Sequence, residues 1–359
     1  MDTPLLRSPG AVAADEPDSS VAAHYGEPFA EQRALTGGAG LVDRSNRGVV
    51  RITGPDRLSW LHSLTTQHLE RLAPDTATQA LVLSPNGHVE HHLTLVDDGT
   101  AVWAHVEPGM AAGLVSFLDS MRFMLRVEAA DVSGQFAVLT LKGPRAGDLA
   151  PEAAATLRQP FGIDLIVMRD QLETLAAQLT GPRGTGHGAT GQGATGQGDS
   201  GARLAGMWAF EALRIAAHQP RFGLDTDHRT IPHEVGWIAT AVHLDKGCYR
   251  GQETVARVHN LGHPPRRLVM LHLDGSADRL PSHGDPVELD GVAVGFVGSA
   301  ARHFELGPIA LALVKRTTPV TADFLAAGIA AAQEVVVSPD EGAKVKVNLR
   351  AASRSLRRA

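Results

Sequence analysis

Apolar positions recur along this chain with two different spacings. Residues 48–52 form a short apolar run typical of a strand, and residues 53–72 place leucines near helical spacing. Within residues 79–106, three apolar runs are separated by the turn-forming pairs Asn-Gly and Asp-Gly, which predicts an antiparallel meander of three strands. The first part of the chain therefore mixes helices with strands that pair locally.

The middle of the chain continues this mixture. The pattern predicts a helix over 108–122, strands near 124–141, a strand at 163–168, a helix after it at 169–179, and a long helix over 202–218. Because the strands cluster together instead of alternating one by one with helices, the pattern favours an α+β fold over a parallel nucleotide-binding sheet.

The segment from residue 266 onward has short apolar runs punctuated by Gly and Pro. Such a pattern over about 80 residues is typical of a small β-barrel. We interpret the basic C-terminal tail as solvated, with RNA or phosphate contact as the alternative. The chain is thus predicted to have four parts, namely a disordered head (1–20), a body (21–262), a barrel (263–340) and a basic tail (341–359).

Residues 181–201 interrupt the body with a near-repeat of Gly-Ala-Thr-Gly-Gln. This composition cannot build a core, so we expect a flexible surface insertion. Its glycines at 186, 188 and 191 match the spacing G-x-G-x-x-G, but no strand leads into them and no acidic residue follows in a βαβ unit. The sequence therefore does not predict dinucleotide binding.

The composition places the chain among ordinary globular proteins. It has 359 residues, of which 43% are hydrophobic and 20% charged, and its formal net charge of −6 argues against a generally basic nucleic-acid-binding surface. The N-terminal residues 1–20 are acidic and lack an apolar core, unlike a secretory or mitochondrial signal. No apolar run approaches the ~20 residues of a membrane helix. We expect a cytoplasmic protein that neither enters membranes nor binds nucleic acid directly.

The single cysteine, Cys248, lies in a turn between Lys246 and Arg250. A lone cysteine excludes an intramolecular disulfide and fits a reducing compartment. If a helix begins near Gln252, its N-terminus and the two cations favour the reactive thiolate over the thiol. The alternative is a structural turn whose cysteine only fills space. One thiol cannot hold an iron–sulfur cluster alone, so any cluster contact would be transient, shared with a partner or made across a dimer.

The segment LDKGCYRGQE, residues 244–253, resembles the K-G-C-[YF]-x-G-Q-E signature of YgfZ-type folate-binding proteins. These proteins are related to the glycine-cleavage T-protein, an aminomethyltransferase, and are similar to factors that assemble iron–sulfur clusters. The resemblance extends over most of the chain and implies two interlocked α+β subdomains followed by a C-terminal β-barrel. It also implies a reactive Cys248 tuned by Lys246 and Arg250, in a loop anchored by Gly247, Tyr249, Gly251, Gln252 and Glu253.

The same resemblance implies two residues that bind tetrahydrofolate. Arg214, in LRIAAHQPRFG, matches an arginine that contacts the folate or substrate, and Asp164, in GIDL, matches an acidic residue that holds the pterin. A carboxylate can accept paired hydrogen bonds from the pterin amino group and ring N–H, and a guanidinium suits a carboxylate or a ring oxygen. Without the resemblance, both residues would be interpreted as surface charges.

One departure from the family concerns the strand after residue 87. Aminomethyltransferases carry two aspartates there, one of which supports catalysis, whereas this chain has GHVEHH with His91 and His92 at those places. A histidine can still act as a base near neutral pH, but the carboxylate is absent. The resemblance therefore implies a folate binder that does not carry out the classical aminomethyltransferase reaction.

Histidines in the same segment leave a metal site as an open alternative. On a strand, His88, Glu90 and His92 would share one face, and such groups can bind zinc or iron. Strand histidines facing solvent or a ligand are commoner, and the pair His259 and His263 spans a helix end and a loop. We therefore expect no metal ligands.

The leading hypothesis is a protein that binds tetrahydrofolate or a one-carbon derivative. By resemblance it assists assembly or repair of [4Fe–4S] enzymes, including tRNA-modifying ones, with iron–sulfur client proteins or assembly factors as partners. Two alternatives remain open: a tetrahydrofolate-dependent aminomethyl or one-carbon transferase, and an interaction module that binds no folate.

Overall fold

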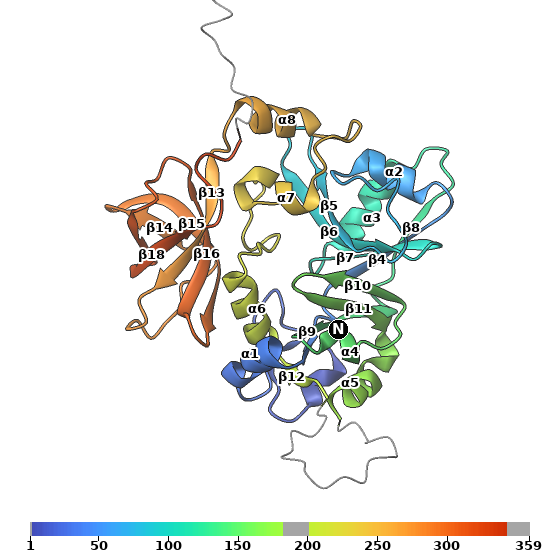
Figure 1. Ribbon diagram of the computed structural model, residues 1–359, viewed down its shortest axis with the longest axis horizontal. Helices are drawn as coiled ribbons and strands as arrows, with labels where there is room; N and C mark the ends of the chain where they lie inside the picture. Colours follow the sequence, from blue (N-terminus) through green and yellow to red (C-terminus); the bar gives the residue numbers. More distant parts are fainter. Residues whose placement is uncertain (1, 182–200, 343–359) are drawn as a thin grey trace, which may run out of the picture.

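The computed structural model describes residues 2–181 and 201–342. Two five-stranded sheets form a body, and a closed six-stranded barrel lies beside it (Figure 1). A buried apolar cluster joins the two sheets and includes Val49 and Trp103 from one and Leu157 and Ile166 from the other. The predicted α+β body with a C-terminal barrel is confirmed. Most of the predicted glycine-rich insertion and of the basic tail lies outside the described residues.

The first sheet combines strands from distant parts of the sequence. Its neighbours pair antiparallel except for the last two, which pair in parallel. The order of its strands is β10 (Ala155–Gln159), β11 (Gly162–Met168), β9 (Phe136–Lys142), β3 (Gly40–Asp43) and β12 (Arg203–Ala205).

The second sheet contains the predicted meander, which is confirmed as three consecutive antiparallel strands. Both faces of its central strands are largely buried, one against two helices and the other against the first sheet. The order of its strands is β5 (Thr78–Leu83), β6 (Val89–Asp97), β7 (Ala101–Val106), β4 (Gly48–Thr53) and β8 (Glu128–Asp131).

The barrel closes entirely through antiparallel pairs. Alternate residues of its strands face an apolar interior that includes Val269, Leu271 and Phe324. Its strands follow one another as β13 (Arg266–Leu273), β16 (Gly307–Lys315), β15 (Val292–His303), β14 (Pro286–Leu289), β17 (Asp323–Ala326) and β18 (Ile329–Val335).

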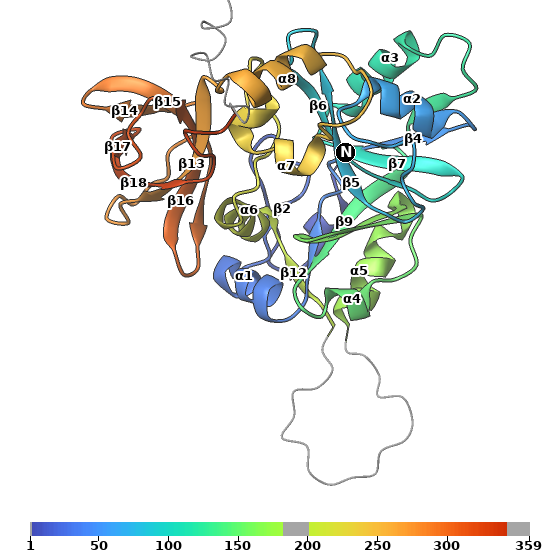
Figure 2. The same cartoon turned by 45° about the horizontal axis from the view of Figure 1, so that its top comes forward.

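Helices connect and cover these sheets. None in the described part of the chain is long and apolar enough to cross a bilayer. Figure 2 shows the seventh and eighth helices between the barrel and the second sheet. The α-helices are α1 (Pro28–Gly37), α2 (Arg57–Leu64), α3 (Ala111–Ser120), α4 (Ala146–Leu149), α5 (Leu172–Thr180), α6 (Met207–Ala216), α7 (Ile238–Ala241) and α8 (Gln252–Leu261), with 3-10 turns at Pro4–Arg7, Arg169–Gln171 and Pro232–Val235.

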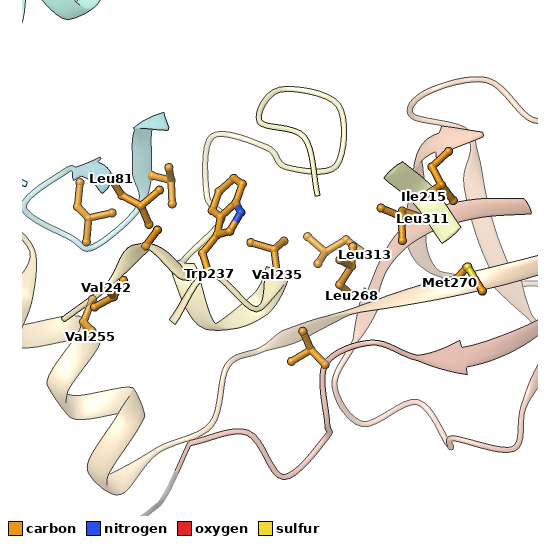
Figure 3. Packing of buried hydrophobic residues seen from close by; sticks show 14 of the residues in the cluster. Leu81, Ile215, Val235, Trp237, Val242, Val255, Leu268, Met270, Leu311 and Leu313 are labelled. Atoms are coloured by element: carbon orange, nitrogen blue, oxygen red, sulfur yellow. The ribbon is translucent and has the colours of Figure 1, made fainter. Parts of the chain in front are cut away.

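One large apolar cluster fixes the barrel to the body. Trp237 and Val235 lie at its centre, with Leu81 of β5 on one side and Leu268 and Leu313 of the barrel on the other (Figure 3). All five side chains are almost fully buried. Burial of each large apolar side chain stabilises the docked arrangement by about 1.5–3 kcal/mol. The barrel is therefore part of one continuous core with the body.

The prediction of a disordered head is wrong for the residues that the structure describes. Residues 2–20 fold onto the body through a 3-10 turn and the strand pair β1 (Val12–Ala13) and β2 (Ala22–His24). Asp18 is buried and accepts two hydrogen bonds from Arg221. The composition suggested disorder because it has little to bury, whereas the head is held by a buried ion pair with a residue about 200 positions away. No local pattern reveals such a pair.

The predicted helix over 53–72 is shorter than the leucine spacing suggested. It ends at Leu64, and the next two threonines are fully buried. Thr66 Oγ1 donates to the carbonyl of Ala241 at 2.6 Å and accepts from the Leu81 amide at 2.9 Å. These contacts with two other segments replace the helical bonds. The predicted helix over 202–218 likewise begins only at Met207, after β12.

Candidate functional site

A cavity of about 370 Å³ lies between the two sheets, α6 and the segment that precedes α7. This volume is within the range of small-molecule sites. Its walls combine the aromatic rings of Phe161, Phe210 and Trp237 with polar side chains from both sheets. Asp164 and Arg214, the two predicted folate residues, both line it, so the fold brings together what the resemblance implied as a pair.

Asp164 projects from β11 and is almost fully buried. Its Oδ1 accepts from Arg44 at 3.1 Å and Thr140 at 2.6 Å, and its Oδ2 accepts from His105 at 3.0 Å and Gln159 at 3.2 Å. Burial alone would raise the pKa of this carboxyl, but Arg44 and the hydrogen bonds hold it well below its usual range. Four bonds use the lone pairs of both oxygens, so a ligand can bind Asp164 only by replacing a protein donor.

The imidazole of His105 has a defined proton position in this network. Its Nδ1 accepts from Arg47 Nε at 2.8 Å, so the proton lies on Nε2, which faces Asp164. Burial and then the charge of Arg47 lower the pKa of His105 to about 4. The ring is therefore neutral at pH 7 and donates to Asp164 without adding a charge.

The network continues as alternating charges to the opposite wall of the cavity. Arg47 donates to Glu107 at 2.6 Å, Arg221 donates to the same carboxylate at 2.8 Å, and Arg221 also binds Asp18. Although burial raises the pKa of Glu107, the two arginines hold it well below its usual value. Buried charges persist only when they are paired in this way.

A second chain of hydrogen bonds leads from Asp164 to the aromatic wall. Gln159 accepts from Gln79 at 3.2 Å, and Gln79 Oε1 faces His92 Nε2 at 3.1 Å. The ring of His92 stacks on Trp237 with 4.6 Å between ring centroids. Because an amide oxygen only accepts, Nε2 of His92 carries the proton.

Arg214 lies on α6 with all five of its N–H groups donated to protein acceptors. They bind Glu211 through two bonds of 2.5 and 3.0 Å, Asp225 at 2.8 Å, the carbonyl of Gln219 at 2.5 Å and Ser299 of the barrel at 2.6 Å. Contact with a folate carboxylate or ring oxygen, as the resemblance implied, would therefore have to displace one of these bonds. In the ligand-free structure Arg214 ties α6 to the barrel and forms one wall of the cavity.

His91 and His92, which occupy the places of the family's acidic pair, are poor bases here. Burial lowers the pKa of His91 to about 4, and burial together with Arg47 lowers the pKa of His92 to about 3. A general base works best with a pKa near the working pH. The alternating directions of β6 place only His92 at the cavity.

The predicted metal alternatives are not supported among the described residues. Glu90 accepts from Arg250 at 2.8 Å and His92 faces Gln79, so the side chains of His88, Glu90 and His92 have separate surroundings. His263 Nδ1 lies 2.9 Å from the carbonyl oxygen of Glu341, and the ring of His259 lies beside that of His233. Neither set brings three ligand atoms close together in the described part of the chain.

Cys248 is exposed, and α8 begins at Gln252 as the sequence predicted. The two flanking cations, however, bind other groups. Lys246 is buried and its Nζ donates to the carbonyls of His62 and Thr65, while Arg250 pairs with Glu90. Burial lowers the pKa of Lys246 to about 8. The cations thus anchor the loop, and none of these groups lines the cavity.

Of the other residues predicted to anchor this loop, three make contacts that fix its conformation and two do not. Tyr249 is buried in the cluster that joins body and barrel, and Gln252 donates to the carbonyl of Lys246 at 3.4 Å. Gly251 has φ +81°, and a Cβ there would lie 2.5 Å from the carbonyl oxygen of Ser84, so only glycine fits. Gly247 has open space around it, and Glu253 pairs with Arg257 of its own helix.

The residues that connect Asp164 to the rest of the cavity were not found from the sequence. They come from the turn between β3 and β4 and from three separate strands, and they are Arg44, Arg47, Gln79, His105 and Gln159. Each would be interpreted alone as a surface polar residue, since the pattern of local burial does not reveal which distant strand lies opposite. No signal in a single sequence could have grouped them.

Comparisons with known proteins agree with this architecture. Residues 10–159 match the family model described as the GCVT N-terminal domain, and residues 266–352 match the glycine cleavage T-protein C-terminal barrel domain. An aminomethyltransferase from Symbiobacterium thermophilum is 29% identical over 294 residues, covering 76% of this chain and 77% of that protein. One from Rubrobacter xylanophilus is 29% identical over 338 residues, covering 88% and 87%.

A solved structure shows the same fold. The glycine cleavage system aminomethyltransferase T from Bartonella henselae superposes with a TM-score of 0.74, covering 95% of this chain and 98% of that one. Its sequence identity is 18%, so the likeness concerns the arrangement of the sheets and barrel.

Proposed function

We propose that this chain, which carries the two domains of the glycine cleavage T-protein and has its fold, binds tetrahydrofolate or a one-carbon derivative in the central cavity. We further propose that it acts as a YgfZ-type protein, assisting the assembly or repair of iron–sulfur enzymes through Cys248. The cavity supports the first part, because it offers aromatic rings for flat ring systems and an ionised carboxylate for N–H groups.

Asp164 is the proposed anchor of the pterin. Its carboxylate stays ionised and is held by four donors, of which Gln159 is a neutral amide at the longest distance, 3.2 Å. A pterin N–H can replace that amide on Asp164, and Gln159 Oε1 would keep the hydrogen bond that it accepts from Gln79, which leaves Gln159 Nε2 free to donate to the ligand. Arg214 holds the wall in place and takes no part in this recognition.

One observation favours a binding protein over a transferase. In the part of the chain that the structure describes, every acidic side chain lining the cavity pairs with an arginine: Asp18, Glu107, Asp164 and Glu211. The pKa values of Glu107, Asp164 and Glu211 are lowered, so these carboxylates are weak bases, and His92 is a weaker base than a free imidazole. The cavity is suited to hold a ligand without abstracting its protons.

Folate binding is tested by thermal unfolding with several reduced folates. A ligand at 100 times its Kd should stabilise the folded chain by about 2.7 kcal/mol. Asp164→Asn is expected to weaken binding at least tenfold, because an amide cannot accept on both sides. The measured quantity is the rise in Tm on adding folate, relative to each variant's own ligand-free Tm.

Cys248→Ala is the matched control, since Cys248 does not line the cavity. It should keep the full rise in Tm. No rise in the wild-type chain with any reduced folate would count against the proposal and would favour an interaction module.

A transferase remains the second candidate because the curated relatives are named aminomethyltransferases. It predicts turnover of an aminomethyl or methyl donor by the purified chain with tetrahydrofolate. Turnover at enzyme-like rates would show a transferase and contradict the proposal of a non-catalytic binding protein. No turnover with a panel of donors is the result expected from a cavity whose carboxylates are all paired with arginines.

Cys248→Ala is expected to leave the fold intact yet abolish rescue of iron–sulfur enzyme activity in a strain lacking this protein. The thiol is exposed on a loop anchored by Lys246 and Tyr249, where a partner protein can reach it. The measurement is client enzyme activity beside the amount of folded variant. Full rescue by this variant would remove the cysteine from the mechanism.

A further inference from the structure

We propose that His62, His68 and Glu70 form a binding site for a divalent transition metal of the zinc type, separate from the folate cavity. One ligand atom of each residue lies within 4.8 Å of the others. The rings of His62 and His68 meet edge to face with 4.7 Å between centroids, and the ring of His243 lies 5.3 Å from that of His68. None of these residues lines the cavity.

The backbone around these side chains is held by contacts between two segments distant in sequence. The His243 amide donates to the carbonyl of Thr66 at 2.9 Å, and Thr66 Oγ1 donates to Ala241 at 2.6 Å. Lys246 Nζ donates to the carbonyls of His62 and Thr65. The end of α2, the turn after it and the loop before Cys248 therefore form one supported unit, which metal sites require of their scaffold.

The groups are chemically ready for a cation. His62 and His68 are half-buried, and Glu70 is exposed at the outer edge, so a metal ion can enter directly from solvent. Nδ1 of His62 accepts a long hydrogen bond of 3.3 Å from the Leu69 amide. A metal ion can replace this bond when it binds the ring.

The ligand set indicates which metals fit. Two imidazoles and a carboxylate are the three protein ligands of many zinc sites with an open fourth position. Imidazole favours zinc, copper, nickel and cobalt, while magnesium and calcium prefer sites built from oxygen. A water molecule or another donor would supply the fourth ligand of a tetrahedral ion.

The test is titration of the chelator-treated full-length chain with Zn²⁺ by calorimetry and with Co²⁺ by visible absorption. We expect one zinc ion per chain at the tightest site and a cobalt spectrum typical of four-coordinate nitrogen and oxygen ligands. His62→Ala, His68→Ala and Glu70→Gln should each weaken zinc binding at least tenfold. Circular dichroism establishes that each variant is folded.

Two variants serve as controls. His228→Ala removes an exposed histidine elsewhere, and Cys248→Ser removes the exposed thiol on the adjoining loop; both should bind zinc as the wild-type chain does. Zinc affinity within threefold of wild type in both His62→Ala and His68→Ala would overturn the proposal. Loss of binding in Cys248→Ser alone would also overturn it, because the thiol would then be the ligand. Neither result depends on whether folate binds.

Discussion

Replacing Arg214 by methionine is expected to lower the free energy of unfolding by about 3–5 kcal/mol, the usual cost of breaking a buried ion pair by removing one partner. The methionine has a similar length but leaves Asp225 without its cation and Glu211 with only Arg221, at 3.6 Å. Asp225 is almost fully buried and cannot turn toward water. Since proteins are typically stable by only 5–15 kcal/mol, this loss is a large part of the total.

The size of the effect follows from the number of segments that Arg214 joins. Its five bonds reach α6 itself, the turn at Gln219, the buried Asp225 and Ser299 in the barrel. Losing them weakens the attachment of the barrel to the body as well as the cavity wall. The measurement is chemical denaturation of the ligand-free chain.

Arg257→Met is the matched control. Arg257 pairs with Glu253 on the same helix, but both side chains are largely exposed, 71% and 85%. Exposed pairs of this kind contribute less than about 1 kcal/mol. If Arg214→Met were as stable as wild type without ligand and lost only folate binding, Arg214 would be a ligand contact and not a structural residue.

Lowering the pH from 7 to 5 is expected to reduce the free energy of unfolding by roughly 4–6 kcal/mol, through three buried histidines. The folded pKa values of His91, His92 and His105 are about 4, 3 and 4, whereas an unfolded histidine titrates near 6.5. Between about pH 6.5 and 4, the unfolded chain binds protons that the folded chain does not. Stability is therefore complete above pH 6.5 and is lost as the pH falls.

Other groups modify this slope without reversing it. His62 and His303 act in the same direction, because burial lowers their pKa values too. Asp43 acts in the opposite direction, since burial raises its pKa, but it is one group against several. Depressed carboxyl groups such as Glu107 add further losses only at more acidic pH.

His91→Leu isolates one of the three contributions. Nδ1 of His91 is buried without a hydrogen-bond partner, so the substitution removes a group whose protonation the folded state disfavours. Below pH 6.5, the free energy of unfolding of wild type should fall more steeply with pH than that of the variant. The difference in slope is up to about 1.4 kcal/mol per pH unit. Denaturant midpoints measured at several pH values give the slope. Equal slopes in wild type and variant would contradict the prediction.

For the two predicted folate residues, the sequence indicated that they lie together but not which hydrogen bonds they make. Asp164 and Arg214 were expected at one ligand site, and both line one cavity. The sequence could not reveal that Arg214 has no donor left for a ligand, because its partners lie up to 85 residues away, in Ser299. Hydrogen-bond occupancy is a property of the packed chain alone.

The cysteine loop shows the same division. Its sequence predicted a helix beginning near Gln252 and an exposed cysteine just before it, and both are confirmed. The expectation that Lys246 and Arg250 place positive charge near the sulfur rested only on their proximity along the chain. Lys246 instead turns inward to the end of α2, since a buried ammonium must find carbonyl oxygens.

The sequence by itself determined the class of fold, the meander, most of α6 and the barrel strands, but not where the helix after residue 53 ends. Local spacing of apolar residues and turn residues is sufficient for these, because each such element buries at least one face wherever it lies. Only the tertiary structure decided what faces the cavity, where the chain's head binds and how the histidines after α2 gather with Glu70. These features depend on pairs of polar groups far apart in sequence, whose energies come from burial that no local pattern encodes.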